Sequence, residues 1–510
     1  MTSTHGRSIA RGVGWMLLFK LTERSLGIVS TLVLARVLSP QDFGVVAMAQ
    51  SVIVMVQLLA MFGFDLALIR DPSASVDHYH TAWTLNAALG ALICLIVVGL
   101  ADPIAAFYSK PELFWVVCAL AASSLFSGLE NIGIVAFRKE MRFRSEFVFQ
   151  VSRKLVAIGV TVPLAFALES YWALVAGTVA SALASTLISY RVHPFRPRFS
   201  LAKAAELFSF SRWLLLGNVI GFVRDRAPDF FIGRFAGAAA LGAYNVSYEI
   251  ANLPTTELSA PINRALMPGY AAVADDRAAL QRTYLEAFGL LACLAVPAAV
   301  GIVALADLLV PVLLGPKWIA TVPLVQMLAA IGVFRVMQSS SAMALVAIGH
   351  PKSVSLASGL YAGVLLVCLA LLVPSLHAEG AAIATAVATL VATPVFLLQL
   401  RRYVGIALRR VAYRVWRPAC GAAVMLAAVS AAVPRYAPEM GVVTAIEHLA
   451  AGAVLAVIAY AGTVVSLWWM VGRPSGAEQA LLAQIRRLLR RRTVSPPRDD
   501  RPTRPMPAGQ

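Results

Sequence analysis

The chain has 510 residues, of which 59% are hydrophobic and only 14% are charged, and its mean hydropathy is +0.76. This composition excludes an ordinary soluble domain and indicates an integral membrane protein. The formal net charge of +17 could suit a nucleic-acid-binding protein, but the distribution of the basic residues along the chain favours membrane topology as its explanation.

Fourteen apolar stretches follow one another along the chain, separated by polar or turn-forming residues. A bilayer core of about 30 Å needs roughly 20 apolar residues per helix. The long continuous runs differ from the short alternating segments of a membrane β-barrel, so we predict an all-α, polytopic membrane protein. The predicted spans are residues 13–38, 43–69, 81–101, 113–137, 146–168, 171–190, 207–233, 241–263, 284–306, 318–349, 354–373, 380–400, 418–433 and 448–471.

The basic residues predict which side of the membrane each loop occupies. Most of the 43 Lys and Arg residues lie at the N-terminus, in every second loop and in the tail, for example in residues 138–144, 191–203 and 401–417. By the positive-inside rule, this bias places both termini in the cytoplasm and requires an even number of spans. The alternate loops hold only Lys110, Arg234, Lys317 and Arg435.

The cysteines and the N-terminus suggest no special chemistry. No short apolar region with a cleavage site precedes the first span, so we expect that span to act as its own insertion signal. The five cysteines lie in predicted spans at unrelated spacings, so neither a disulfide framework nor a metal cluster is expected. They are Cys94, Cys118, Cys293, Cys368 and Cys420.

The tail beyond residue 471 has two predicted parts. Residues 477–492 place apolar residues on one stripe with arginines opposite, which predicts a basic amphipathic helix on the inner membrane face. The Pro-rich residues 493–510 are predicted to be disordered.

An internal repeat predicts the architecture. An ungapped shift of 198 residues superimposes Trp15 on Trp213, Arg36 on Arg234 and Gly44 on Gly242. Spans one to six and seven to twelve then form two parallel lobes, as in transporters that work by alternating access around a central cavity. The predicted domains are an N-lobe at 1–192, a linker at 193–206, a C-lobe at 207–402, two extra spans at 403–471 and a cytoplasmic tail at 472–510.

The first span of each lobe carries charged residues deep in the membrane. In the first span, Lys20, Glu23, Arg24 and Gly27 share one helix face, and Arg24 lies about 16 Å deep by the helix rise. Three central charges cost about 8 to 10 kcal/mol, more than the apolar residues of that span return, so this face must meet protein or water. The equivalent part of the seventh span carries Asn218, Arg224, Asp225, Arg226, Pro228 and Asp229.

Cations on both first helices predict a cavity that accepts an anionic, phosphate-containing substrate. For Arg24 and Arg224 we favour cavity lining over intramembrane ion pairing. For Lys20, Arg226 and Arg335 the two interpretations stay open.

Other polar residues and prolines in the spans support weaker predictions. Arg36, Arg153, Lys154 and Arg212 lie near span ends, where snorkelling to the membrane surface is the better interpretation. The candidate sites for a coupling proton or sodium ion, each equally open to a structural role, are Glu23, Asp65, Glu130, Asp225, Glu249 and Glu257. The candidate hinges, equally open to being packing kinks, are Pro228, Pro254, Pro261 and Pro268.

Two segments resemble a known family. "LARVLSPQDFGVVAMA" with the following "FGFDLALIR", and the block from Trp213 to Tyr270, are similar to the polysaccharide transporter (Wzx-type) oligosaccharide flippases of the multidrug/oligosaccharidyl-lipid/polysaccharide exporter superfamily. The resemblance covers about residues 8–400 and implies a V-shaped, two-lobed fold of the MATE type with twelve to fourteen helices. It also implies that the protein moves polyprenyl-diphosphate-linked oligosaccharides across the bacterial inner membrane for lipopolysaccharide, capsule or exopolysaccharide biosynthesis. The family has no strict signature, so Arg24 and Arg224 are predicted from this sequence alone.

Several alternatives stay open. A MATE-type drug/cation antiporter is the nearest, and a lipid-linked peptidoglycan precursor flippase is another relative. A polytopic polymerase or glycosyltransferase is less favoured, because the predicted outer loops are short and no catalytic motif is present; we expect no enzyme activity, no metal and no cofactor beyond an ion gradient. The expected partners are the lipid-linked oligosaccharide and membrane lipids, not nucleic acid, and a polysaccharide polymerase and chain-length regulator stay open.

Overall fold

The structure is a computed structural model that describes residues 22–58, 63–71, 73–474 and 479, and at 208–218, 254–261 and 263–265 it describes the backbone alone. Across these described residues, all regular secondary structure is helical. A helix over residues 22–37 comes first. The labelled helices that follow are α2 (Pro40–Leu58), α3 (Phe64–Arg70), α4 (Val76–Gly99), α5 (Ala101–Tyr108), α6 (Leu113–Gly128), η1 (Ile132–Ile134), α7 (Val135–Lys139), α8 (Phe143–Leu168), α9 (Trp172–Val192), α10 (Ala204–Phe235), α11 (Gly237–Ala272), α12 (Arg277–Leu314), η2 (Pro316–Thr321), α13 (Val322–Ala347), α14 (Pro351–Tyr403), α15 (Leu408–Ala432) and α16 (Val442–Met470).

The predicted all-α, polytopic class is confirmed. Within the described part of the chain, nine helices are long and apolar enough to cross a membrane, or ten if α6 and residues Ile132–Lys139, bent by 63°, form one span. Helix α14 has 53 residues, about 80 Å at the usual rise and more than twice what a bilayer core needs. Its helical geometry breaks at His377 (φ 53°, ψ −129°), between the predicted spans 354–373 and 380–400. The count of fourteen spans stays a prediction.

One predicted span is interrupted. Within the apolar stretch 43–69, which also covers most of α2 (Pro40–Leu58), α3 begins as a new helix at Phe64. Gly63 immediately precedes α3 with a left-handed backbone (φ 65°), a conformation that glycine adopts at little cost. Hydropathy does not detect such a break, because the residues on both sides are apolar.

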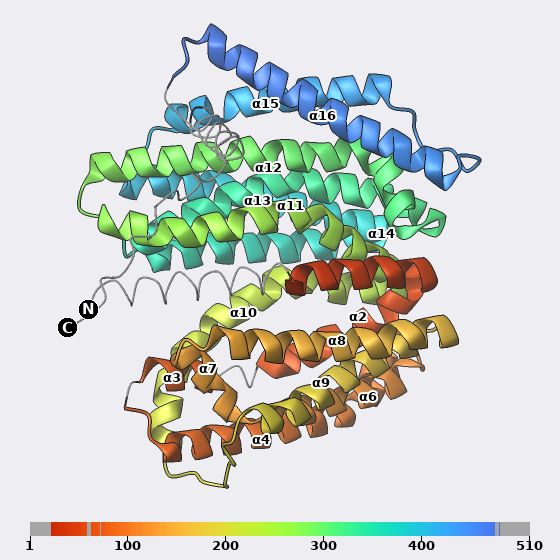
Figure 1. Cartoon of the computed structure of the whole chain (residues 1–510), viewed down its shortest axis with the longest axis vertical. Helices are drawn as coiled ribbons and strands as arrows, with labels where there is room; N and C mark the ends of the chain where they lie inside the picture. The colour runs from red at the N-terminus through yellow and green to blue at the C-terminus, as the bar shows by residue number, and fades with distance from the viewer. Residues whose placement is uncertain (1–21, 59–62, 72, 475–478, 480–510) are drawn as a thin grey trace, which may run out of the picture.

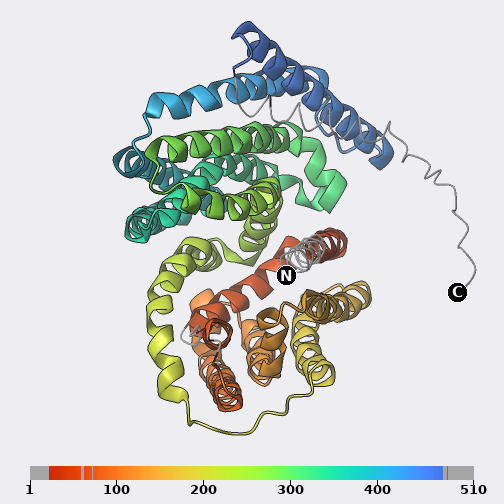
Figure 2. The same cartoon turned by 60° about the vertical axis from the view of Figure 1, so that its left-hand side comes forward.

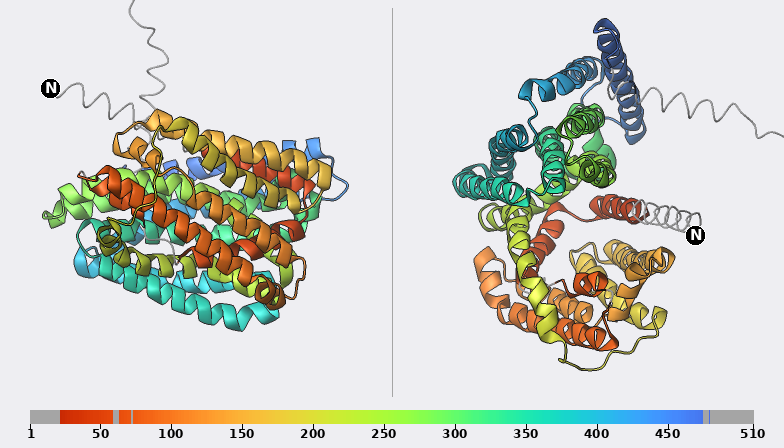
Figure 3. Two further views of the ribbon diagram at one scale, coloured as in Figure 1. Left: turned by 90° about the horizontal axis from the view of Figure 1, so that it is seen from below. Right: turned by 90° about the vertical axis from the view of Figure 1, so that its left-hand side faces the viewer.

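The helices form two groups (Figure 1). Helices α3–α9 lie in one group and α11–α14 in the other, and α15 and α16 stack on the outer side of the second group. The helix of residues 22–37 lies where the groups meet, and α10 runs from there along the side of the first group (Figures 2 and 3). The lobe boundaries proposed from the sequence stay a prediction.

Helix α2, which packs on α4 and α6 of the first group, crosses α11 of the second group, and two glycines make this contact possible. A Cβ added at Gly44 would overlap the Ala238 carbonyl oxygen and lie 2.8 Å from Ala238 Cα. A Cβ added at Gly242 would overlap the Pro40 carbonyl oxygen and lie 2.8 Å from the Gly44 nitrogen. The 198-residue shift pairs Gly44 with Gly242 and Pro40 with Ala238, so repeat-related positions pack on one another. Small residues at such crossings let helix backbones approach closely in a membrane.

Aromatic residues reinforce this α2–α11 crossing from both sides. Trp318 of η2 is fully buried and donates its indole N–H to the Ala35 carbonyl oxygen over 2.8 Å. Tyr108 of α5 is buried against Gly233, where an added Cβ would lie 2.6 Å from the tyrosine ring. Because Gly233 is the repeat equivalent of Ala35, the two aromatic contacts occupy corresponding places in the two halves.

Two repeat-related arginines make side-chain contacts near this crossing. The Arg36 guanidinium donates to the carbonyl oxygens of Val312 and Leu313 at the C-terminal end of α12, where a cation also complements the helix dipole. Its equivalent, Arg234, lies over the Phe107 ring at 5.8 Å from the centroid. Arg36 therefore caps another helix, and its snorkelling to the membrane surface stays a prediction.

Candidate functional site

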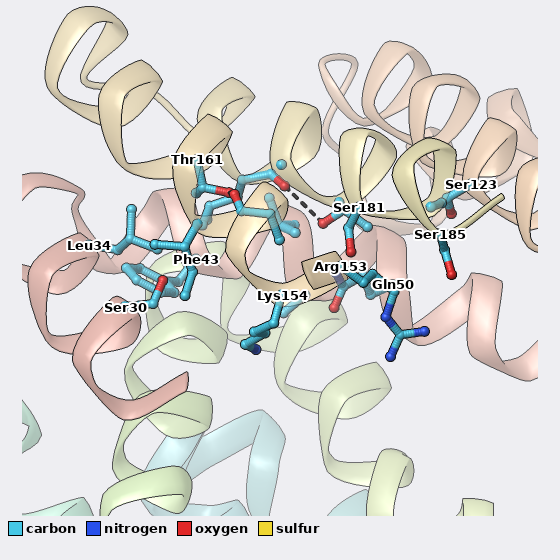
Figure 4. A pocket seen from close by; sticks show the side chains of 18 of the residues that line it. Ser30, Leu34, Phe43, Gln50, Ser123, Arg153, Lys154, Thr161, Ser181 and Ser185 are labelled. Carbon is cyan, nitrogen blue, oxygen red and sulfur yellow. Dashed lines mark hydrogen bonds between the residues drawn. The ribbon is translucent and has the colours of Figure 1, made fainter. Parts of the chain in front are cut away.

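A cavity of about 1010 Å³ lies beside the α2–α11 crossing. Its walls come from the helix of residues 22–37 and from α2, α6, α8, α9, α10 and α11 (Figure 4). Hydroxyl and amide side chains recur on these walls, so the cavity offers many hydrogen-bonding groups to a polar ligand. They are Ser30, Gln50, Ser123, Ser127, Gln150, Thr161, Thr178, Ser181, Ser185 and Asn245.

Helix α8 supplies two of the cations of the cavity. Gln150, Arg153, Lys154, Ala157 and neighbouring residues line the wall at helical spacing, so one face of α8 meets the cavity. Figure 4 shows Arg153 and Lys154 among the lining side chains. The Lys154 ammonium lies 3.8 Å from the Cβ position of Gly27 on the first helix. Among the described residues, no carboxylate oxygen lies within 4.0 Å of a nitrogen of either cation.

The sequence predicts that Arg153 and Lys154 lie near a span end. The predicted span begins at residue 146, whereas α8 begins at Phe143. Arg153 is therefore ten residues into the helix, or about 15 Å along its axis. The spacing of Gln150, Arg153 and Lys154 with Ala157 and Thr161 was the available signal, because it places polar residues on one face of an otherwise apolar helix.

Three of the predicted site residues line the cavity, namely Glu23, Asp225 and Arg226. The charges on α10 are largely paired with one another. Arg224 binds Asp225 through two hydrogen bonds of 2.8 and 3.1 Å, and Arg226 donates to the buried Asp229 over 3.2 Å. Arg224 thus faces a carboxylate partner directly, which reduces its capacity to attract a ligand anion.

Other predicted residues lie away from the cavity wall. Arg24 is half-buried on the helix of residues 22–37 and is not among the lining residues. Arg335 of α13 binds Tyr248 and Asn252 of α11 instead of reaching the cavity. Glu249 of α11 is half-buried and also lies off the wall. Lys20 falls outside the described residues.

A second charged cluster lies behind the α9 wall. Glu130 accepts a 2.5 Å hydrogen bond from Ser185, which lines the cavity. Glu130 is also within electrostatic reach of Arg153, Asp65 and Arg138. The candidate carboxylate Asp65 therefore lies near Glu130, whose hydrogen-bond partner Ser185 is on the cavity wall.

The candidate hinge prolines lie in α10 and α11. Pro228 lies inside α10, and Pro268 is exposed near the end of α11. At Pro254 and Pro261 the backbone is helical, and their side chains lie outside the description, as does that of Glu257. The hinge role stays a prediction.

Two groups of apolar helices around a polar, charged cavity define a multi-pass membrane protein of the transporter class. A family model described as "Polysaccharide biosynthesis protein" matches residues 33–323. The chain therefore belongs to this polysaccharide biosynthesis family.

Sequence relatives come from several bacteria. The chain is 26% identical over 332 residues to the lipopolysaccharide biosynthesis protein WzxC of Escherichia coli (strain K12), which is 64% of this chain and 67% of the relative. It is 28% identical over 335 residues to the succinoglycan biosynthesis transport protein ExoT of Rhizobium meliloti (strain 1021), again 64% and 67%. Thus about a third of each relative lies outside the match.

Solved structures show the same fold. The lipid II flippase MurJ in an inward closed conformation matches with a TM-score of 0.72 and 11% identity, over 89% of this chain and 99% of that one. An inward-facing multidrug resistance MATE transporter matches with a TM-score of 0.55 and 13% identity, over 75% and 94%. The expected likeness to the MATE fold is confirmed.

Proposed function

We propose that this protein is a flippase that moves polyprenyl-diphosphate-linked oligosaccharides across the bacterial inner membrane for surface polysaccharide biosynthesis. Family membership and the names of the relatives support polysaccharide biosynthesis and transport. The observation that carries the mechanism is the polar cavity beside the α2–α11 crossing, with Arg153 and Lys154 on its wall.

The cavity suits the part of such a substrate that the bilayer rejects. Its volume of about 1010 Å³ is at the upper end of ordinary ligand pockets. The cations offset the cost of removing a diphosphate from water, and a guanidinium can bind phosphate oxygens through two hydrogen bonds. The serine, threonine and amide groups of the wall replace water around sugar hydroxyls, while the polyprenyl tail stays in lipid.

Both termini are proposed to be cytoplasmic, as the loop charges predict. The α2–α11 crossing then lies at the outer ends of these helices, and the cavity is closed on that side. Separation of α2 from α11 would open the cavity outward, which completes alternating access. Among the carboxylates proposed for coupling to a proton or sodium gradient, Glu23 and Asp225 line the cavity, and Asp65 and Glu249 are off it.

The test uses purified protein in vesicles that contain a polyprenyl-diphosphate-linked oligosaccharide, with movement to the opposite leaflet as the readout. R153Q/K154Q should lower the rate about tenfold or more, because a hydrogen bond to a charged group is worth about 1.5 to 3 kcal/mol. R401Q/R402Q is the matched control, because this adjacent basic pair is exposed at the end of α14. Wild-type rates for R153Q/K154Q would contradict the assigned site.

The cargo assay also separates the alternatives. A wild-type protein that moves a cationic dye but no lipid-linked oligosaccharide would favour the drug antiporter and overturn the proposal. Movement of a lipid-linked peptidoglycan precursor in preference to the oligosaccharide would favour the precursor flippase. Cleavage or elongation of the sugar during the assay would reveal enzyme activity, which we do not expect.

A further inference from the structure

Arg335 of α13 is a cation held behind the wall that α11 contributes to the cavity. Its Nη1 donates to the Tyr248 hydroxyl oxygen over 2.6 Å and to Asn252 Oδ1 over 3.1 Å, and its guanidinium carbon lies 4.8 Å from the centre of the Tyr248 ring. Asn252 in turn donates its Nδ2 to the Tyr248 carbonyl oxygen over 2.8 Å. Both ends of the Asn252 amide are therefore engaged, which holds Arg335 in one position against Tyr248.

The chemistry of these groups sets the direction of the hydrogen bond. A guanidinium carries only donors and stays protonated in proteins, so the Tyr248 oxygen must be the acceptor. The hydroxyl proton of Tyr248 is then available to a different acceptor, and no hydrogen bond from this hydroxyl to another described residue accompanies the one from Arg335. Tyr248 lines the cavity, so an acceptor in the cavity can take this proton in a hydrogen bond.

The positive charge of Arg335 would also be stabilised by a nearby anion. No carboxylate lies within 4.0 Å of its guanidinium in the part of the chain that the structure describes. Its titratable neighbours are the tyrosines Tyr248, Tyr361 and Tyr244, and Tyr244 is engaged with Thr385 over 3.3 Å. Because an uncompensated charge away from water is costly, an anion in the cavity near Tyr248 would stabilise this arrangement.

We propose that Tyr248 is a hydrogen-bond donor to a diphosphate oxygen of the substrate and that Arg335 is the positioning residue that polarises its hydroxyl. This inference rests on the proposed function and adds to it. Arg153 and Lys154 belong to α8, whereas Tyr248 belongs to α11. A diphosphate bound between the α8 cations and Tyr248 contacts both halves of the protein at once. Its affinity is then higher when the halves are close than when they are apart. A ligand can drive a conformational change only through such a difference in affinity.

The matched variants are Y248F and Y244F. Each removes one hydroxyl from neighbouring tyrosines of α11, but Tyr244 is buried and bonded to Thr385, whereas Tyr248 lines the cavity. The probe is farnesyl diphosphate, with farnesol as the uncharged control, and Kd is measured on purified full-length protein at one fixed salt concentration. Y248F should raise the Kd for farnesyl diphosphate about tenfold, in line with a hydrogen bond to a charged group, and leave that for farnesol unchanged. Y244F should leave both unchanged.

A second pair of variants tests Arg335. R335Q should weaken farnesyl diphosphate binding to the same extent as Y248F, and R335K should restore part of it, because lysine keeps the charge and a donor. Combining R335Q with Y248F should cause little further loss, because the two residues act through one hydroxyl. A purely structural role would instead weaken farnesol binding as well and would make the two losses add.

The outcomes separate this inference from the proposed function. If wild type prefers farnesyl diphosphate to farnesol and Y248F binds both as wild type does, the assignment of Tyr248 is overturned and the flippase proposal stands. If wild type does not prefer the diphosphate and moves no lipid-linked oligosaccharide, both proposals fall.

Discussion

Gly44→Ala should shift the protein away from the state described by this structure. The added methyl group would overlap the Ala238 carbonyl oxygen, and the contact can be relieved only if α2 and α11 separate. Overpacking of this kind costs about 1 to 3 kcal/mol. Alanine also favours the helix over glycine by about 1 kcal/mol, but that gain is the same in both access states. The population that is open at the crossing should therefore rise about 5- to 150-fold.

The assay is labelling of A47C from outside the cell with a membrane-impermeant thiol reagent. Ala47 lines the cavity one helical turn beyond Gly44, and the protein without A47C gives the background from native cysteines. Gly159→Ala is the matched control, because Gly159 lies inside α8 with nothing within 4 Å of an added Cβ. Both glycine variants are made in the A47C protein. If Gly44→Ala at normal abundance is labelled no faster than A47C alone, the reasoning is refuted. The same holds if Gly159→Ala accelerates labelling as much as Gly44→Ala does.

Three further variants probe contacts elsewhere in the structure as well as at the crossing. W318F removes the indole hydrogen bond to Ala35, worth about 1 kcal/mol, and should raise external labelling of A47C about fivefold; unchanged labelling would exclude Trp318 from the closure. G90A would bring a Cβ within 2.6 Å of the Ser124 carbonyl oxygen inside one helix group, so it should lower the Tm without changing the labelling, and altered labelling would contradict this. Lys203 and His78 hold the pKa of Glu206 below its usual value, so the stability from this group is present above the ordinary pKa and is lost as pH falls through the lowered one. E206Q should thus lower the Tm at pH 7, and a difference that does not shrink as pH falls below the ordinary glutamate pKa would oppose this assignment.

The fold was largely predictable, because the bilayer imposes strong rules on the sequence. Long apolar runs can cross a membrane only as helices or closed barrels, and the helical class followed from their continuity. The 198-residue shift paired Gly44 with Gly242, and these residues meet in the structure. The break at Gly63 was not predictable from hydropathy, because it depends on the backbone angles of one residue within apolar surroundings, whereas the break at His377 falls between two predicted spans.

The site was harder to predict, because depth in the membrane does not reveal which helix faces the cavity. Arg224 lies on α10, where its neighbour Asp225 binds it. Adjacent opposite charges in a sequence leave open whether they pair or point apart, and only packing decides this. Tyr248 lacked any signal of its own, because a tyrosine in an apolar span is normally a packing residue; its role emerges from the contact with Arg335, 87 residues away in the chain.

The distribution of paired and unpaired charge has a consequence for the transport cycle. The α10 cations Arg224 and Arg226 carry their own carboxylate partners, so they can move with the helix and keep those partners. Arg153 and Lys154 lack such partners in the described structure, and a diphosphate would supply the missing negative charge. If that anion also accepts from Tyr248, separation of the two halves must break contacts on one side of it. The ligand would then be held strongly only while the halves are close, and outward opening would itself weaken binding and promote release.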